Sequence, residues 1–525
     1  MTKYLIKRIL RALLSVVLVV AVIMVMIYAF IPRENIFGDD PNYNKQLEND
    51  RETYKMRQWE RFGYVDYIPY ADFLSEELKA GNITQEEMKT ASKLGATAEK
   101  DNETTQKMVE AFTKKYESQG YKVERLEGKL KIGTKKYRDG AKPALYAYRD
   151  IPLTKRLVSY FTGLIKVDNI HNAEEVVGER GLTFTWKDPV YGGEKFSPAI
   201  IGNGTNYKYL LYCDDTFPYI HQNLIRVNLG VSYSVRSGID VFTTMTEAQG
   251  PMKTSVHTYP SGYVDENADD LHTLQYVPGS LSSGGELTQK YYVDDYTGYN
   301  TAKSGLSKMG YSFVIGIISV ILAYLVAVPL GIAMALNKDK AIDKLGTFYI
   351  IFIMAVPSLS YIFIFRALGS LIKLPTTFTV QSPSVLMYVL PVISLALPSI
   401  ANLMKWLRRY MIDQMNADYV KFARSGGLSE GQIFRKHVLK NAIIPIVHGI
   451  PGSVLGALTG AIITERVYMV PGIGNVLTEA INKYDNGVIV GVALFYALLS
   501  VTSFILGDVL MSLMDPRISF TSKQR

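Results

Sequence analysis

The chain has 525 residues, of which 48% are hydrophobic and 20% charged, with a formal net charge of +8 and one cysteine. Several stretches of 18 or more apolar residues hold almost no charge, which places the chain in a membrane. A simple soluble enzyme, a disordered chain and a disulfide scaffold are therefore excluded. The segment 33–307 holds 34 basic and 39 acidic residues, whereas the rest holds 23 and 10. Basic residues that gather beside apolar segments indicate membrane topology and give no reason to expect nucleic-acid binding.

The first apolar segment, Ile9–Ile31, begins among four basic residues near the N-terminus, Lys3, Lys7, Arg8 and Arg11. It is longer than the apolar part of a signal peptide, and no small-residue cleavage site follows it. We therefore expect residues 1–32 to form a cytoplasmic N-terminus and an uncleaved membrane helix.

The acidic segment 33–307 is expected to form a large extracytoplasmic α+β domain between the first and second membrane helices. Thr84 and Glu87 make a T-x-x-E capping box before a helical stretch, and Asp101 is expected to open a second helix. From Tyr121 onwards the pattern alternates as in strands, with Gly, Asn and Pro at the turns.

Five further apolar segments are long enough to cross a bilayer of about 30 Å. They lie at 309–336, 346–371, 385–404, 442–464 and 487–513. Together with the first span they predict an α-helical integral membrane protein with six transmembrane helices, five of them in a membrane domain at 308–515. The clusters of Lys and Arg then fall on the side of the N-terminus, so both termini, including the tail 516–525, are expected in the cytoplasm.

Charged residues lie in or at the ends of these spans. Arg366 is either a functional charge inside the membrane or a side chain that reaches the nearby interface. Glu465 and Arg466, at the outer end of the fifth span, favour a local ion pair or an interface anchor over a substrate contact. Asp508 in the sixth span is expected to pair with a basic group or a backbone donor rather than to bind a proton.

The fifth span carries glycine at four-residue spacing, at Gly452, Gly456 and Gly460. Two overlapping G-x-x-x-G units allow another helix to approach closely, and we favour this packing role over simple flexibility. The neighbouring helix belongs either to this chain or to a partner.

The loop 417–447, between the fourth and fifth spans, holds the most informative pattern. Tyr419, Phe422 and Ala423 lie on one apolar face of a short helix, and the pair Gly426–Gly427 ends that helix. An S-x-x-Q capping box follows and starts a second helix that continues into the fifth span. Such a projection suits docking into a groove of another protein, and contact of a basic loop with anionic lipid is the alternative.

These residues resemble the EAA loop of peptide-type ABC-importer permeases, with the pattern D-Y-V-x-x-A-R-x-x-G-L followed by H-x-L-x-N-x-x-x-P. The matching positions are Asp418, Tyr419, Val420, Ala423, Arg424, Gly427, Leu428, His437, Leu439, Asn441 and Pro445. The stretch ERVYMVPGIGNVL (465–477) resembles the E-x-V-F-x-x-P-G-x-G-x-L pattern of the same family, and Asp508 with DPRI (515–518) resembles its C-terminal D-x-x-x-x-x-x-D-P-R signature. Their motif residues here are Pro471, Gly472, Gly474, Asp508, Asp515, Pro516 and Arg517.

The resemblance is to the B-type membrane subunit of oligopeptide permeases, and it covers residues 1–70 and about 222–525. It implies the type I fold of ABC importer permeases. Residues of about 76–215 look like an insertion into a segment that is usually short in the family, although a large ectodomain resembles the streptococcal-type members. We expect this insertion to help dock or orient a peptide-loaded receptor.

The resemblance implies an ABC importer for oligopeptides, of which this chain forms half of the pathway. The implied partners are a second, C-type permease, two cytoplasmic ATP-binding subunits, an extracellular peptide-binding lipoprotein, peptides and membrane lipid. The sequence has no nucleotide-loop or zinc-site motif, so we expect a transport subunit that binds no cofactor, with ATP and magnesium on the partner ATPases. The residues implied in coupling to an ATPase are Asp418, Tyr419, Ala423, Arg424, Gly426, Gly427, Leu428 and Glu430.

The sequence also allows alternative substrates and three other classes of function to be considered. Dipeptides, nickel or another small solute are alternative substrates, because related permeases share these motifs. An ion-driven transporter predicts paired carboxylates in the membrane and inverted repeats, and the sequence shows neither. A membrane-anchored ligand sensor needs a cytoplasmic output domain, but only about ten residues follow Asp515. An enzyme on the ectodomain needs a nucleophile or metal constellation, and none can be assembled.

Overall fold

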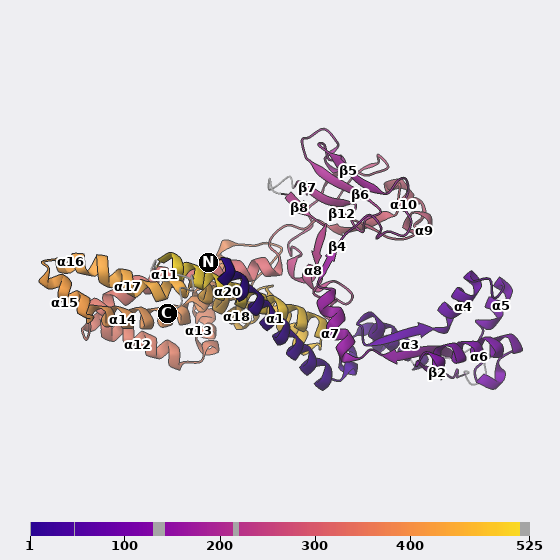
Figure 1. Ribbon diagram of the computed structural model, residues 1–525, viewed down its shortest axis with the longest axis horizontal. Helices are drawn as coiled ribbons and strands as arrows, with labels where there is room; N and C mark the ends of the chain where they lie inside the picture. Colours follow the sequence, from indigo (N-terminus) through magenta and orange to yellow (C-terminus); the bar gives the residue numbers. More distant parts are fainter. Residues whose placement is uncertain (1, 47, 130–141, 214–219, 515–525) are drawn as a thin grey trace.

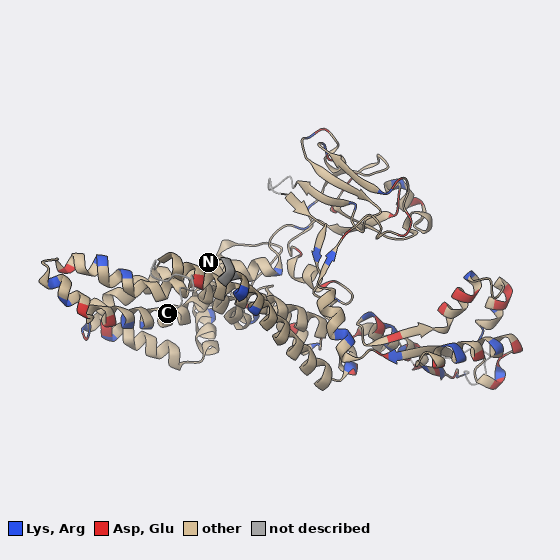
Figure 2. Ribbon diagram, viewed as in Figure 1, with Lys and Arg blue, Asp and Glu red and all other residues tan. Residues whose placement is uncertain are grey.

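The computed structural model describes residues 2–46, 48–129, 142–213 and 220–514. A long bundle of membrane helices lies at one end of the molecule, and two lobes built from the segment between the first two long helices extend from the other end (Figure 1). Charged residues are frequent at the far tip of the bundle and over one of the lobes (Figure 2).

The bundle is built from long apolar helices. In the described residues, four helices are long and apolar enough to cross a membrane, and the count becomes six if each of two bent helix pairs is one span. The four are α1 (Thr2–Phe30), α11 (Lys308–Leu336), α14 (Val389–Met415) and α20 (Asn486–Met514). The predicted six spans therefore correspond to four long helices and two bent pairs.

The first bent pair corrects the prediction of one continuous helix over 346–371. The chain forms α12 (Ala341–Ala355) and α13 (Ser358–Leu371), which meet at 107°. Pro357 lies between them and restricts Val356 to the extended region, at ψ 129°. The uniform hydropathy of this stretch hid the break.

The second bent pair enters the fifth span with a change of direction of 43°. Gly449 ends the first helix, and Pro451 lies in the first turn of the next. The helix expected to continue past Pro445 is present, but it includes a π-helical turn. In chain order the elements are α16 (Glu430–Ile433), the π turn (Phe434–Val438), α17 (Leu439–His448), α18 (Ile450–Tyr468) and α19 (Ile473–Asn482).

The centre of the bundle lies where α11 packs along α14. Small residues of α11, including Ala323 and Ala327, are buried in the same hydrophobic cluster as Ala401 and Leu407 of α14. Small side chains let the two helix backbones approach closely, which is the usual basis of helix packing in membranes.

One lobe has a three-stranded antiparallel sheet covered by helices. Thr84 forms the predicted capping box with Glu87, whereas the next helix is capped by Asn102 and not by Asp101, which instead pairs with Arg125 at 2.7 Å. The sheet order is β1 (Val65–Pro69), β3 (Ala144–Asp150) and β2 (Lys122–Leu126), and the helices are α3 (Glu48–Arg61), α4 (Tyr70–Lys79), α5 (Gln85–Ala91) and α6 (Glu103–Ser118).

The other lobe is built mainly from strands. Its four-stranded antiparallel sheet has the order β5 (Gly181–Thr185), β6 (Ala199–Asn203), β7 (Tyr209–Cys213) and β8 (Ile220–Gln222). Three two-stranded ribbons accompany it: β4 (Ile165–Val167) with β9 (Ile225–Val227), β10 (Ser255–Thr258) with β11 (Val264–Asn267), and β12 (Asp269–Tyr276) with β13 (Tyr296–Thr301). The predicted mixture of helices and strands in this segment is confirmed.

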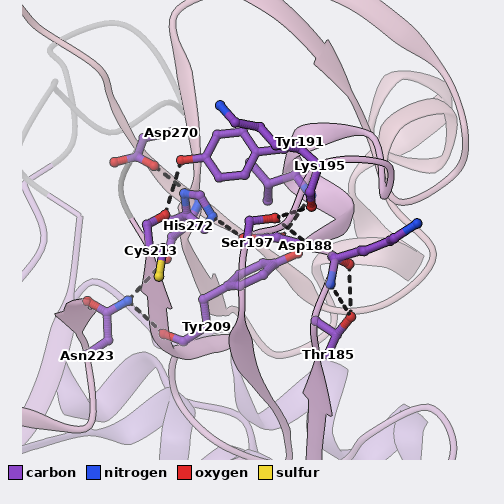
Figure 3. A network of polar contacts seen from close by, with 12 residues as sticks. Thr185, Asp188, Tyr191, Lys195, Ser197, Tyr209, Cys213, Asn223, Asp270 and His272 are labelled. Atoms are coloured by element: carbon purple, nitrogen blue, oxygen red, sulfur yellow. Dashed lines mark hydrogen bonds and ion pairs between the residues drawn. The ribbon is translucent and has the colours of Figure 1, made fainter. Parts of the chain in front are cut away.

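A buried polar network ties the strands of this second lobe together (Figure 3). His272 Nε2 lies 2.6 Å from an oxygen of Asp188, and Tyr212 stacks on the imidazole with ring centroids 4.1 Å apart. Ser197 accepts a hydrogen bond from the Asp188 backbone at 2.9 Å. Because each buried polar group has a partner, the network stabilises one arrangement of the sheet and the ribbon β12–β13.

The lobes join the membrane helices at the C-terminal end of α1. The guanidinium of Arg156, from α7 (Leu153–Thr162), lies between the rings of Tyr28 and Tyr64, at 3.8 and 3.9 Å from their centroids. The side chain of Asn486, at the start of α20, donates a hydrogen bond to the Tyr64 hydroxyl at 2.8 Å. Stacked and hydrogen-bonded contacts of this kind orient the lobes relative to α1 and α20.

Candidate functional site

The predicted helix, bend and helix are present at the tip of the bundle farthest from the lobes (Figure 1). The first helix is α15 (Asp418–Ser425), and Gly427 follows it with φ +84° in the left-handed region. Ser429 and Gln432 form the reciprocal capping box that starts α16. We refer to residues 417–447 as the coupling segment.

The residues of the predicted apolar face of α15 lie in two different environments, the core of the bundle and the surface. Val420 is buried in the core of the bundle, and Tyr419 and Ala423 pack against that core. The Tyr419 hydroxyl also donates to Gln414 Oε1 at 2.7 Å. Phe422, in contrast, is 74% exposed on the outer side. The expectation of one docking face is corrected, because the inner residues hold the helix to the bundle and Phe422 alone of these points outwards.

One ion pair spans the bend of the coupling segment. Arg424 donates two hydrogen bonds to the carboxylate of Glu430, at 2.5 and 3.1 Å, across the glycine pair. These hydrogen bonds, and then the charge of Glu430, raise the pKa of the Arg424 guanidinium. The pair is exposed and contributes little to stability, but its bidentate geometry fixes the angle between α15 and α16.

A cavity of about 520 Å³ opens in the bundle between α14 and the helices α17 and α18. Trp406 and Tyr410 stack there with centroids 5.7 Å apart, and the Tyr324 hydroxyl lies 3.2 Å from that of Ser453. Among the described residues that line it, no side chain is acidic or basic. They are Tyr324, Pro398, Ser399, Asn402, Leu403, Trp406, Tyr410, Pro445, Ile446, Gly449, Gly452, Ser453 and Gly456. Aromatic, amide and hydroxyl groups of this kind can contact amides and varied side chains.

Two glycines of the row on α18, Gly452 and Gly456, line this cavity. A Cβ added at Gly452 or Gly456 would meet no atom of the described chain within 4 Å, whereas one at Gly460 would lie 3.6 Å from Leu395 Cδ1. No helix of the described residues therefore packs on Gly452 and Gly456. Packing of a partner helix on this row stays a prediction.

The carboxylate of Glu465 is buried at the end of α18, at 0% exposure. It accepts hydrogen bonds from the Ser312 hydroxyl of α11 at 2.6 Å and from the Asn475 amide of α19 at 3.1 Å. The expected ion pair with Arg466 is wrong, because Arg466 donates instead to the side chain of Asn475. Glu465 thus joins α11, α18 and α19 at the C-terminal end of α18.

The glycines of the P-G-x-G motif make room for this carboxylate. A Cβ at Gly472 would overlap the Glu465 carboxylate, and one at Gly474 would lie 2.6 Å from the Ile462 Cα and 2.9 Å from Glu465 Oε2. The sequence marked these glycines by resemblance alone. The structure gives the physical reason, which is close approach of a buried acid.

Comparison with known proteins agrees with this arrangement. Residues 327–520 match the family described as "Binding-protein-dependent transport system inner membrane component". The whole chain is 34% identical to the oligopeptide transport system permease protein AmiC of Streptococcus pneumoniae, over 100% of this chain and 99% of that protein. The dipeptide transport system permease DppB of Bacillus subtilis is 29% identical over 213 residues, covering 40% of this chain and 68% of that protein.

The chain belongs to the oligopeptide permease family of ABC importers. It is a membrane-embedded transport subunit, not an enzyme, and permeases of this family work with ATP-binding subunits and further components. The similarity to AmiC extends over both lobes, whereas the match to DppB is limited to two fifths of the chain.

The structure tests some of the expectations for the other charged residues of this permease. Asp508 pairs with Arg8 of α1, which confirms the expected basic partner. Arg366 is half-buried in α13, and neither of its two alternatives is tested. Asp515, Pro516 and Arg517 lie outside the described residues.

Sequence reasoning missed the residues that line the cavity. Trp406, Asn402 and Tyr324 come from helices whose mutual arrangement no local pattern reports. A signal was available in α14, where an amide and two aromatic residues interrupt an apolar helix at Asn402, Trp406 and Tyr410, four residues apart and therefore on one face.

Proposed function

We propose that this permease imports oligopeptides and forms half of their path through a bacterial cell membrane. The observation that carries the proposal is the cavity beside α14 and α18. Its lining of aromatic, amide and hydroxyl groups without charge suits a ligand with a constant amide backbone and side chains of either charge. The name of the full-length relative, an oligopeptide permease, supports the same substrate class.

The proposed orientation places both termini and the coupling segment in the cytoplasm and both lobes outside. The basic residues at the tip with α15 and α16 support it through the positive-inside rule (Figure 2). The proposed partners are a second, C-type permease, two ATP-binding subunits that hold ATP and magnesium, and an extracellular peptide-binding lipoprotein. Phe422 and the residues around the glycine bend would contact one ATPase and transmit its closure to α17 and α18.

The strand-rich lobe carries a surface suited to the peptide-binding lipoprotein. Leu182, Phe184 and Trp186 alternate along and just beyond β5, and each is at least 54% exposed. Trp186 stacks on Phe196, which is 72% exposed, at 5.8 Å between centroids. A contiguous exposed aromatic patch is typical of a protein interface. It lies inside the insertion 76–215, for which we propose the docking role.

The importer is tested by recovery of the tagged chain from native membranes in mild detergent. We expect a second permease, two ATPases and a lipoprotein in the complex, with ATP hydrolysis stimulated by peptide. Recovery of the chain alone, without ATPase activity, would contradict the proposed function.

The docking patch is tested with Trp186→Ala combined with Phe184→Ser. The expected result is lower peptide uptake at limiting lipoprotein, with the membrane complex still assembled. Leu287→Ala is the matched control, because Leu287 is 69% exposed in α10 (Gly285–Tyr291) of the same lobe and lies outside the patch. Uptake kinetics that stay unchanged in the double variant would remove the docking role.

A further inference from the structure

A groove of about 460 Å³ lies between α1 and α20. The two helices pack tightly further along, where Val20, Met24 and Ile27 of α1 are buried. Towards the N-terminus of α1 they leave a groove between them. It is lined by Arg8, Arg11, Ala12, Ser15, Val16, Val19, Ala497, Ser500, Val501, Phe504 and Ile505.

The charges in this groove are confined to one end. Arg8 is paired with Asp508, whereas the side chain of Arg11 has no hydrogen bond or ion pair with the described residues. One turn deeper, the Ser15 hydroxyl donates to the Arg11 carbonyl, and beyond it the walls are apolar apart from Ser500. The groove therefore has a cationic mouth and an apolar depth, the arrangement of an amphiphile with an anionic head.

We propose that this groove binds an anionic phospholipid of the cytoplasmic leaflet, with its phosphate at Arg11 and an acyl chain between α1 and α20. The assignment rests on the proposed orientation, in which the N-terminus of α1 is cytoplasmic. Basic pockets between membrane helices on the cytoplasmic side bind the head groups of anionic lipids, since the surface potential of this leaflet and the low dielectric favour the pairing. Arg8 does not compete for this phosphate, because its guanidinium already forms an ion pair with the Asp508 carboxylate.

The position of the groove favours a lipid over other occupants. Phe504, on its wall, is 65% exposed, and Leu10, Leu14 and Leu18 on the neighbouring face of α1 are 61–67% exposed, so the surface around the groove is apolar and available to acyl chains. A soluble anion would leave the apolar walls of the groove without a partner. An apolar helix of a partner would leave the Arg11 guanidinium at the mouth without an anion.

The first test measures lipid that stays with the purified importer complex. In Arg11→Gln, retained phosphatidylglycerol should fall about fivefold, the change expected for one arginine at an anionic surface. Arg11→Lys should restore it, and Lys7→Gln, on an exposed neighbouring position of α1, should leave it unchanged. Equal retention in wild type and Arg11→Gln would overturn the proposal.

The second test identifies the occupant directly and does not require a variant that disturbs the charge. A photoreactive benzoyl-phenylalanine at Phe504 should cross-link to phospholipid in native membranes. Cross-linking to the second permease would overturn the lipid assignment. The orientation is read separately from the labelling of Lys7→Cys in a Cys213→Ala background by an impermeant reagent, so failure of the orientation and failure of the lipid site are distinguishable.

Discussion

The carboxylate of Asp485 accepts a hydrogen bond from the Ser232 hydroxyl at 2.7 Å, across 253 residues of sequence. The same carboxylate accepts hydrogen bonds from three successive backbone amides, each at 2.9 Å. The Tyr233 amide donates to Oδ1, and the amides of Ser234 and Val235 donate to Oδ2. Asp485 is fully buried in the turn between α19 and α20. One side chain therefore joins the lobes to the loop between the last two spans.

Removal of this carboxylate should loosen the junction. In Asp485→Ala the Ser232 hydroxyl and the three backbone amides lose their acceptor, and each unsatisfied buried group costs about 1–3 kcal/mol. We expect a lower thermal midpoint of the purified complex and faster proteolysis between the lobes and α11. Glu479→Gln is the control, because Glu479 forms a half-exposed pair with Lys483 and such pairs contribute little. An equal effect of both variants would contradict the role of Asp485.

The bend of the coupling segment should depend on glycine at one of its positions. Gly427 has φ +84° with no atom within 4 Å of an added Cβ, so Gly427→Ala introduces backbone strain of about 1–2 kcal/mol without a clash. We expect weaker recovery of the ATPase or lower peptide-stimulated hydrolysis. Gly431→Ala lies in α16 with open space and ordinary φ, and should keep coupling. Normal coupling in Gly427→Ala would show that the bend angle is unimportant.

Features that depend on neighbours in sequence could be predicted. The capping boxes at Thr84 and Ser429 and the bend at Gly427 are confirmed, because each is set by a few consecutive residues. The break at Pro357 was missed, although proline gave the signal, since hydropathy over twenty residues cannot distinguish a straight span from two helices at 107°.

Features that depend on distant neighbours could not be predicted. A local ion pair of Glu465 with Arg466 was one of two favoured roles, the other being an interface anchor, but the carboxylate accepts a hydrogen bond from Ser312, 153 residues earlier. The cavity lining and the contact of Asp485 with Ser232 likewise require three-dimensional packing. The family resemblance marked the glycines near Glu465 without giving their reason.

The close approach at Gly472 should make that position sensitive to a single methyl group. In Gly472→Ala the new Cβ would overlap the buried Glu465 carboxylate, which must then leave Ser312 or Asn475. Overpacking of this kind costs about 1–3 kcal/mol, so we expect a lower thermal midpoint and less assembled complex. Gly181→Ala, where an added Cβ meets nothing within 4 Å, should behave as wild type. A fully stable Gly472→Ala would show that Glu465 can move at no cost.

The glycine row of α18 offers a test between a path and a packing surface. In Gly456→Leu the new side chain enters the cavity, where the described chain leaves open space, so we expect the permease to assemble and bind its ATPases while peptide uptake falls at least several-fold. Thr459→Leu adds the same side chain at an exposed position outside the cavity lining and should transport normally. Uptake of labelled peptide and recovery of the second permease are measured together. If Gly456→Leu instead releases the second permease, the row is a helix-packing surface of the G-x-x-x-G type and the path lies elsewhere.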